Sequence, residues 1–455
     1  MKKTIFVTSI ALALVYAGGA HAETLREALA AAYNSNPELQ AERAALRAID
    51  EGVARARSGF LPTLTGVGNI TRQNTVSESA GTQLFDFTAT SKFYQARADQ
   101  SLFRGFQDVF SIKQAKSLVM AGRAQLRATE QRILLDAVAV YMNTLRDESV
   151  LALNQNNVQV LERQLQASHD RFRVGEITRT DVAQSEARLA GSVSQRITAE
   201  ANLATARANY LRIIGQLPGT LERPPELPGL PVSVDEAWAI ASQENPSISL
   251  AIYGERAAVQ NVRRSMGALA PTVVGFATLS RSTGSNPSVN TGTTVDFLTD
   301  LKTFGVQIRV PLYQGGAVYS DIRRAKQTQS QRLLDIITAE RQVRSDARTG
   351  FELYRAAKSS IVSNQSQVKA NEIALNGVRQ EASVGQRTTL DVLDAEQELL
   401  DARVNLVRAE RDLHVASFSY LSALGRLNAV ALALPVDVYD AEAYYGKLKW
   451  RLIGW

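Results

Sequence analysis

The sequence predicts an exported α+β membrane protein that is internally duplicated and combines long helices with a few membrane strands. Three observations predict this class: a repeat of about 210 residues, two long proline-free stretches, and two segments with the alternation of membrane strands. A repeat this long is far outside the roughly 20–50 residues of solenoid units. It marks a duplicated structural half, so an interpretation of one half can be checked on the other.

The repeat is defined by residues that recur at a constant offset. Early in each half the offset is 209, as between Pro62 and Pro271, and later it is 210, as between Gly105 and Gly315. One residue has therefore been inserted between these landmarks. The other matched pairs are Glu27-Ala28 with Glu236-Ala237, Asn36-Pro37 with Asn245-Pro246, Gly175 with Gly385, Asp181 with Asp391, Tyr210 with Tyr420, and Gly215 with Gly425.

The first residues are typical of an export signal. Lys2 and Lys3 give a positive start, an apolar segment follows, and Ala20-His21-Ala22 has the form of a cleavage site. The apolar segment is too short to cross a bilayer as a helix. We expect 1–22 to be a signal peptide and the mature chain to begin at Glu23.

Composition argues against several kinds of site. The chain has no cysteine, so it has no disulfide framework and no thiolate metal ligands. After the signal only His169 and His414 remain, which leaves little for a catalytic triad or a histidine metal site. The net charge of +6 is mild, and no block of like charges indicates a nucleic-acid arm. We expect no enzyme activity, no cofactor and no nucleic-acid partner.

Each half contains a long stretch that favours helix. The stretches lack proline and are rich in Ala, Leu, Gln, Glu and Arg, which are good helix formers. Val174-Gly175 interrupts the first and Val384-Gly385 the second, and glycine after a helical run is a stop signal. The sequence therefore predicts two helical hairpins, at 105–215 and 314–430. One arm of the first would be roughly 100 Å long if unbroken.

Two other segments, 62–104 and 271–313, are rich in Thr, Gly, Ser, Phe and Val, and each is expected to form a β-hairpin. In the second strand of each, alternate residues are mainly apolar, with Gln100 as the exception. The apolar positions are Tyr94, Ala96, Ala98 and Leu102 in the first half, and Phe304, Val306, Ile308, Val310 and Leu312 in the second. Such alternation is the signature of an outer-membrane strand, although a half-buried soluble sheet is an alternative.

Four strands per chain cannot close a membrane barrel, because the smallest barrels have about eight. An open edge in lipid would leave backbone groups unpaired, at several kcal/mol each. Strands that enter a membrane must therefore share one barrel with other copies of the chain.

The remaining segments connect or end the two halves. The first half spans 23–217 and the second 233–434, and each is expected to open with a helix before its β-hairpin. Between them, 218–232 is a proline-rich linker. A tail, 435–455, follows the second half.

The most specific motifs are the run Ser-Val-Gly-Gln-Arg-Thr-Thr-Leu-Asp-Val-Leu-Asp-Ala at 383–395, Val174-Gly175 with Thr180-Asp181-Val182, and Tyr420-Leu421 with Ala423-Leu424-Gly425. With the repeat, they resemble the TolC family of outer-membrane efflux and secretion channel-tunnels over essentially the whole mature chain. The resemblance implies a homotrimer. Each chain would give four strands to a twelve-stranded β-barrel and long helices to an α-helical periplasmic tunnel.

The resemblance also implies location and partners. The protein would lie in the cell outer membrane, in contact with outer-membrane lipid, and would extend into the periplasm. A periplasmic adaptor (membrane fusion) protein would connect it to an inner-membrane RND or ABC transporter, which supplies the energy. The channel itself would be passive.

By this resemblance, Asp391 and Asp394 match acidic residues that line the tunnel constriction. They are three apart on a helix and share a face. In a trimer they would form two carboxylate rings that attract cations and raise each other's pKa by like-charge repulsion. The alternative for Asp391 is a helix cap, since Asp is a preferred capping residue.

The resemblance further implies that Arg387 bonds to Thr180 and Asp181 of the other hairpin tip and keeps the entrance closed. The tyrosine that the family usually has before Ser-Val-Gly is Ala382 here, so one family link is missing. The alternative for Arg387 is a solvated surface charge. The tip residues that match adaptor contacts are Val174, Gly175, Val384 and Gly385. A plain left-handed helix cap at the two glycines is compatible with that role.

The resulting prediction is a passive trimeric exit duct for drugs, toxins or proteins, with an iris-like rearrangement of the hairpin tips as its gate. The 383–395 run slightly favours the type I secretion members of the family over those that serve multidrug pumps. A periplasmic coiled-coil scaffold without a pore explains the helices but not the alternating strands. A secreted hydrolase lacks a nucleophile motif.

Overall fold

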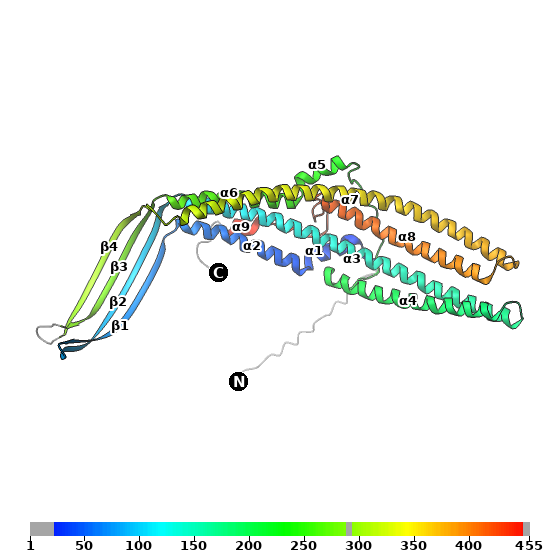
Figure 1. The fold of residues 1–455 in the computed structure, drawn as a ribbon, viewed down its shortest axis with the longest axis horizontal. Coiled ribbons are helices and arrows are strands. Elements are labelled where there is room, and N and C mark those ends of the chain that lie inside the picture. Colours follow the sequence, from blue (N-terminus) through cyan, green and yellow to red (C-terminus); the bar gives the residue numbers. More distant parts are fainter. Residues whose placement is uncertain (1–21, 288–293, 449–455) are drawn as a thin grey trace, which may run out of the picture. The chain divides into compact units, whose positions relative to one another are not determined.

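The computed structural model describes residues 22–287 and 294–448. The expected signal peptide, apart from Ala22, lies outside the described residues. So do the expected turn of the second β-hairpin at 288–293 and the end of the tail at 449–455. Within the described part, the same order of elements occurs in both halves (Figure 1).

The elements of the first half are α1 (Leu25–Ser35), α2 (Pro37–Arg57), η1 (Ser58–Phe60), β1 (Thr63–Ser79), β2 (Thr82–Arg104), α3 (Gln107–Arg173) and α4 (Arg179–Ile214). Those of the second half are α5 (Val234–Glu244), α6 (Pro246–Met266), η2 (Gly267–Leu269), β3 (Thr272–Pro287), β4 (Thr294–Arg309), α7 (Ala317–Ser383) and α8 (Thr389–Ala423). The long helices α3 and α7 have the same length, 67 residues. The duplication read from the sequence is thus a duplication of structure.

The chain divides into two compact units, and α3 and α7 each contribute to both. The sheet unit consists of Glu38–Thr129, Ile240–Ser345 and the segment from Tyr439 onward. The helical unit contains the described residues up to Pro37, together with Glu130–Ala239 and Asp346–Val438. A short helix, α9 (Ala443–Leu448), lies in the expected C-terminal tail and belongs to the sheet unit.

The sheet has the order β1-β2-β3-β4, and every neighbouring pair is antiparallel. The β2–β3 ladder, from Ser91↔Gly284 to Arg104↔Thr272, joins the two halves of the duplication. β1 and β4 are the edges. Register shifts interrupt the ladders at Ser77/Glu78 and at Ser101/Phe103, and the outer sides of β1 and β4 carry backbone groups that still need partners.

Large apolar side chains of the sheet are exposed in the single chain. The exposed fraction is 81% for Leu64 and 73% for Phe304, and it is also high for Ile70, Tyr94, Leu102, Leu298, Leu301, Val306 and Ile308. Among the described helices of the sheet unit, none lies over either face of the sheet in Figure 1. A soluble sheet would bury one apolar face against another layer. The sheet therefore presents apolar surface that the described helices of its own unit do not cover.

None of the helices in the described part of the chain has an apolar run long enough to cross a membrane.

In the sheet unit the two halves touch backbone to backbone. A Cβ atom added at Gly105 would lie 2.2 Å from the carbonyl oxygen of Gly267, and one added at Gly267 would lie 2.3 Å from that of Gly105. Gly105 also has a φ of 60°, in the left-handed region that favours glycine. Both the conformation and the contact require glycine where β2 turns into α3.

In the helical unit, a buried tyrosine pair holds the start of the described chain. The hydroxyl oxygen of Tyr141 lies 2.7 Å from the carbonyl oxygen of Glu23 and 2.6 Å from that of Glu222, and its single proton can be donated to either. The hydroxyl of Tyr210 donates to the Glu23 carboxylate (2.7 Å). Burial raises the pKa of both tyrosines well above its usual value, so they stay neutral donors. Glu23 also forms a parallel bridge with Leu221. The chain between the halves is thereby fastened to the first residue expected in the mature protein.

Candidate functional site

Both helical hairpins turn with the same backbone geometry. α3 ends in a turn where Gly175 has a φ of 77° and its N–H donates to the Phe172 carbonyl (3.0 Å). α7 ends likewise at Gly385, with a φ of 78° and a bond to the Ala382 carbonyl (3.1 Å). A Cβ at either glycine would meet nothing within 4 Å, so the left-handed conformation alone selects glycine here.

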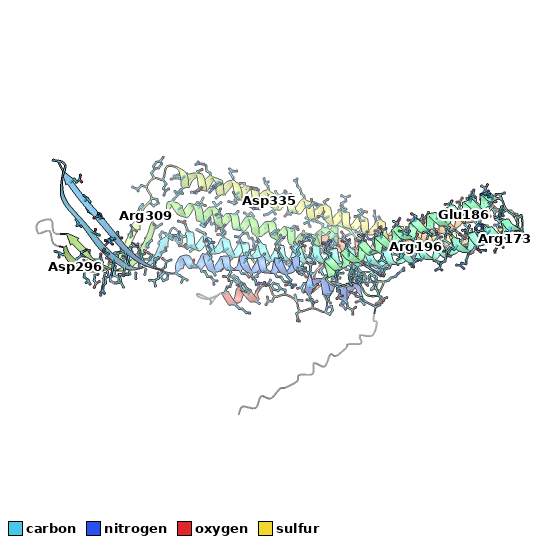
Figure 2. All side chains as sticks on the ribbon, turned by 90° about the horizontal axis from the view of Figure 1, so that it is seen from below. Arg173, Glu186, Arg196, Asp296, Arg309 and Asp335 are labelled. Atoms are coloured by element: carbon cyan, nitrogen blue, oxygen red, sulfur yellow. The ribbon has the colours of Figure 1, made fainter. Side chains whose placement is uncertain are left out.

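A valine is exposed beside the glycine at each tip. Val174 is 78% exposed and Val384 is 70% exposed. The end of the first hairpin can be followed in Figure 2, where Arg173 is labelled at the tip and Glu186 lies on α4 close to it. Each tip thus exposes one large apolar side chain, and its role as an adaptor contact stays a prediction.

The next helix of each hairpin starts with a capping box. Thr178 caps α4, and its N–H and hydroxyl donate to the Asp181 carboxylate at 2.9 Å and 2.7 Å. Thr388 caps α8, and donates to Asp391 in the same way at 2.9 Å and 2.8 Å. In each box the threonine oxygen accepts the N–H of the aspartate in return. Both aspartates therefore help to begin a helix.

The capping bonds set the direction of the aspartate pKa values. Hydrogen bonds from Thr388 lower the pKa of Asp391 below its ordinary value, and the Arg387 charge adds a smaller effect in the same direction. Those from Thr178 lower the pKa of Asp181 likewise. In the single chain this is opposite to the rise expected from a carboxylate ring, because a hydrogen-bonded carboxylate prefers its charged form. The ring itself needs a trimer and stays a prediction.

Arg387 is bound within its own hairpin. Its Nε donates to the Glu381 carboxylate at 2.8 Å, between the end of α7 and the tip turn. Among the described residues it makes no hydrogen bond to Thr180 or Asp181, the partners implied by the family resemblance. Thr180 is exposed on the first turn of α4. The first tip has its own ion pair, from Arg171 to Glu176 at 2.7 Å.

Asp394 is bound across the hairpins. Its carboxylate accepts a hydrogen bond from Nη2 of Arg188 on α4, which makes an ion pair between α4 and α8. Both side chains are about half exposed, at 41% for Arg188 and 52% for Asp394. One of the two predicted constriction residues therefore also connects the two hairpins.

A cavity of about 680 Å³ lies between the two hairpins beside these groups. Its lining is mainly polar, and its charged residues are Arg163, Arg171, Arg379 and Arg387 with Glu176 and Glu396. The buried Glu396 accepts from Arg379 at 2.9 Å through one oxygen, while its other oxygen has no partner within the described chain. Polar walls between two hairpins permit small relative movements at a low cost in buried apolar surface.

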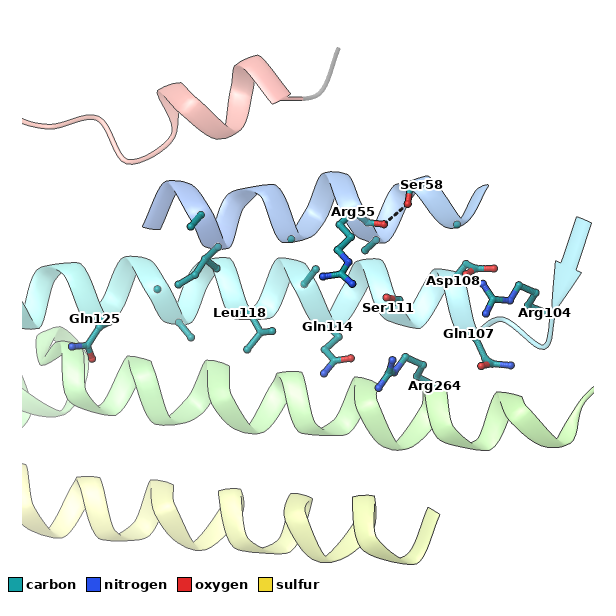
Figure 3. A pocket seen from close by; sticks show the side chains of 18 of the residues that line it. Arg55, Ser58, Arg104, Gln107, Asp108, Ser111, Gln114, Leu118, Gln125 and Arg264 are labelled. Carbon is teal, nitrogen blue, oxygen red and sulfur yellow. Dashed lines mark hydrogen bonds and ion pairs between the residues drawn. The ribbon is translucent and has the colours of Figure 1, made fainter. Parts of the chain in front are cut away.

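A second cavity, of about 850 Å³, lies in the sheet unit and is lined by α2, α3 and α6 (Figure 3). Arg55 and Arg264 line it, together with Gln114 and Leu118 of α3. Arg104 at its end is paired with Asp108 at 3.2 Å. Exposed arginines on a helix surface are ordinarily solvated, so this cavity is not the candidate site.

The described residues contain no group of three or more histidine, aspartate and glutamate side chains arranged to hold a metal ion.

The sequence singled out the tips, Asp391 and Asp394, whose roles stay predictions, but it did not single out Arg188. The signal was present in the repeat. Arg188 is equivalent to Glu398 of the second half, and Asp394 is equivalent to Gln184 of the first half. The two halves therefore carry different charges at equivalent positions, and one of these positions lies in the 383–395 motif.

Comparison with known proteins gives the family. The model described as outer membrane efflux protein matches residues 28–216 and 239–426, one segment in each half. The outer membrane efflux protein BepC of Brucella suis biovar 1 (strain 1330) is 35% identical over 433 residues, which cover 95% of this chain and 92% of BepC. The outer membrane protein TolC of Escherichia coli (strain K12) is 27% identical, covering 90% of this chain and 83% of TolC.

Among solved structures, the Campylobacter jejuni CmeC outer membrane channel has the same fold. The TM-score is 0.77 at 14% identity, and the match covers 94% of this chain and 90% of CmeC. Nothing in these descriptions indicates a catalytic activity. The family and the location that the sequence predicted are confirmed. The chain belongs to the outer membrane efflux protein family, as a TolC-family protein of the outer membrane.

Proposed function

We propose that this protein is the trimeric exit duct of a tripartite efflux or type I secretion system, closed at its periplasmic end by the two helical hairpins. Three chains would each give β1–β4 to a twelve-stranded barrel. The helices would form the periplasmic tunnel, and drugs, toxins or proteins would pass through it. The duct has no energy source of its own, so an adaptor and an inner-membrane transporter would supply cargo and energy.

The observation that carries the proposal is the open sheet. Four antiparallel strands display exposed apolar side chains, and the outer sides of β1 and β4 end the ladder. In lipid each unpaired backbone group costs several kcal/mol, so the edges must be paired. Pairing β1 of one copy with β4 of the next closes the barrel without any further segment.

The gate is proposed to be an iris-like rearrangement of the tips. The polar cavity and the half-exposed ion pairs at the hairpins, unlike a packed apolar core, would allow two arrangements of similar free energy. Val174, Gly175, Val384 and Gly385 would contact the adaptor.

The test is single-channel conductance of the detergent-purified protein in a planar bilayer. We expect small, cation-selective openings that multivalent cations block. The double variant Asp391→Ala with Asp394→Ala should lose both the selectivity and the block, because the carboxylates at the constriction would be gone. Openings that the double variant leaves unchanged would keep the duct and remove both residues from the constriction.

The oligomer can be tested on the same preparation. Mass measurement in detergent should give three chains per particle, and cysteines introduced on the outer sides of β1 and β4 should cross-link between copies. A properly folded, monodisperse monomer that forms no openings would refute the duct and favour a scaffold without a pore.

Arg387 has a more limited predicted effect. Arg387→Ala should make the entrance easier to open, through loss of the links to Thr180 and Asp181 of the other hairpin tip that we propose for the closed trimer. The measurement is open probability and uptake of large antibiotics. If neither changes, Arg387 is a solvated surface charge rather than part of the gate.

A further inference from the structure

The contact between Arg188 and Asp394 differs from the other ion pairs near the tips. Arg171–Glu176 joins residues of the first hairpin, and Arg387–Glu381 and Arg379–Glu396 join residues of the second. Arg188–Asp394 instead runs from α4 to α8 and joins one hairpin to the other. Movement of the hairpins apart would leave the first three pairs intact and break this one.

The backbone holds both partners in place. Asp394 lies one turn beyond Asp391, whose carboxylate is fixed by the Thr388 capping box, so its position on α8 is set by a well-defined helix start. Arg188 lies within α4, whose start is fixed by the equivalent box at Thr178. The ion pair is therefore formed between two helices whose starts do not depend on it.

We propose that Arg188 is a gate and selectivity residue: it links the two hairpins in the closed state and offsets the charge of Asp394 at the constriction. The inference rests on the proposed duct and adds a residue that neither the sequence motifs nor the family resemblance supplied. Arg188 makes the entrance harder to open and less selective for cations than two uncompensated carboxylate rings would be.

Two consequences separate this role from a purely structural one. Loss of either partner breaks the link, so Arg188→Gln and Asp394→Asn should both open the gate more often. The charge effects have opposite signs, because Arg188→Gln leaves an uncompensated carboxylate while Asp394→Asn leaves an uncompensated guanidinium. Cation selectivity should therefore rise in the first variant and fall in the second.

The size of the gating effect follows from exposure. A half-exposed ion pair is weakened by solvent, so each link should change the open-to-closed ratio by about twofold, and three links that break together by about tenfold. The effect should shrink at high ionic strength, where charges near the surface are screened.

The experiment compares wild type, the two single variants, the double variant and the exchange Arg188→Asp with Asp394→Arg in planar bilayers. Open probability and the reversal potential in a salt gradient are recorded for each. The double variant should open about as often as the single variants, because one link is lost in all three. The exchange should restore a low open probability, since the pair is re-formed with its charges reversed.

Arg196→Gln is the matched control. Arg196 is also an arginine of α4 and pairs with Glu200 at 2.6 Å, but this pair stays within one helix. Its loss should leave gating and selectivity at wild-type values. Thermal melting of each variant shows that the protein is folded.

If the wild type forms channels and Arg188→Gln has the same open probability and reversal potential, this inference is overturned while the proposed duct is not. A shift of selectivity in the same direction in both single variants would also overturn it. A folded wild-type protein that forms no channels would overturn the duct and this inference together.

Discussion

The two helical hairpins have one backbone and two sets of charged contacts. Their tip glycines have φ values of 77° and 78°, and each second helix starts with a Thr-Asp capping box. Beyond these aspartates, charged side chains differ between the halves: Arg188 stands where the other half has Glu398, and Asp394 where it has Gln184. The duplication kept what determines the fold and changed the charges where we place the gate.

The same contrast occurs in the sheet unit. Gly105 and Gly315 are equivalent, and their φ values are 60° and 61°. Only Gly105 is in close contact with another backbone, at Gly267, whereas a Cβ at Gly315 would meet nothing within 4 Å. Equivalent positions thus have equal conformations but unequal surroundings. Matched substitutions at Gly105 and Gly315 can separate the effect of the backbone conformation from that of the close contact.

The largest expected effect is that of Gly105→Ala. The new Cβ would lie 2.2 Å from the Gly267 carbonyl oxygen, so two backbone segments must move in addition to the strain of a left-handed alanine. We expect a loss of about 3 kcal/mol or more, seen as a lower melting temperature and a lower yield of folded protein. Gly315→Ala should cost only about 1 kcal/mol, from its φ alone. Equal losses of stability in the two variants would mean that the close contact between Gly105 and Gly267 contributes little to the cost of the added Cβ.

Much of the fold could be predicted because it depends on local signals that the duplication repeats. Pro62 and Pro271 precede strands, and glycine ends a long helix at 175 and 385, so each signal was read twice. The Arg188–Asp394 pair escaped the same reasoning because its partners are not repeat equivalents. It depends on how two helices pack, and Arg188 alone does not differ from an ordinary helix-surface charge.

The contacts of the C-terminal tail could not be predicted from the sequence for a related reason. Arg123 of α3 binds Glu442 at 2.5 Å, and Tyr444 donates to Glu51 of α2 at 2.6 Å. The ring of Tyr445 packs on the cluster of Val53, Ala115 and Val119. These contacts join segments more than 300 residues apart, and no periodicity in a short tail predicts them.

A smaller effect is expected at Tyr210 and Tyr420, which are equivalent in the two halves. Tyr210 donates to the Glu23 carboxylate at 2.7 Å, while its equivalent Tyr420 donates to the Pro231 carbonyl at 3.4 Å. Burial raises the pKa of Tyr420 to about 12, so both hydroxyls are protonated donors near neutral pH. Tyr210→Phe should cost about 1–2 kcal/mol because its acceptor is charged, and Tyr420→Phe about 0.5 kcal/mol. Melting temperatures of the two variants measure the difference.

Glu23→Gln tests the source of that difference. It keeps an acceptor for Tyr210 but removes the charge, so Tyr210→Phe in this background should cost about the same as Tyr420→Phe. A difference that persists would assign the larger effect to packing around the buried ring rather than to the hydrogen bond.

The smallest effect on stability, and the sharpest test of the comparison, concerns the capping aspartates. Asp181→Ala and Asp391→Ala remove equivalent bonds, so hydrogen exchange should increase equally in the first turns of α4 and α8. Both pKa values are lowered in the folded state. The stabilisation that the two capping aspartates give to the folded state is therefore complete above their ordinary pKa of 3.8. It is lost as the pH falls through their lower pKa in the folded protein. In wild type, acid should increase hydrogen exchange at both tips, and in each variant it should no longer do so at the altered tip.

Ion selectivity should change only in Asp391→Ala, because we place only that aspartate at the constriction. A change of selectivity in Asp181→Ala would mean that both hairpins line the pore, and the functional difference between the two halves would then be one of partners rather than of position.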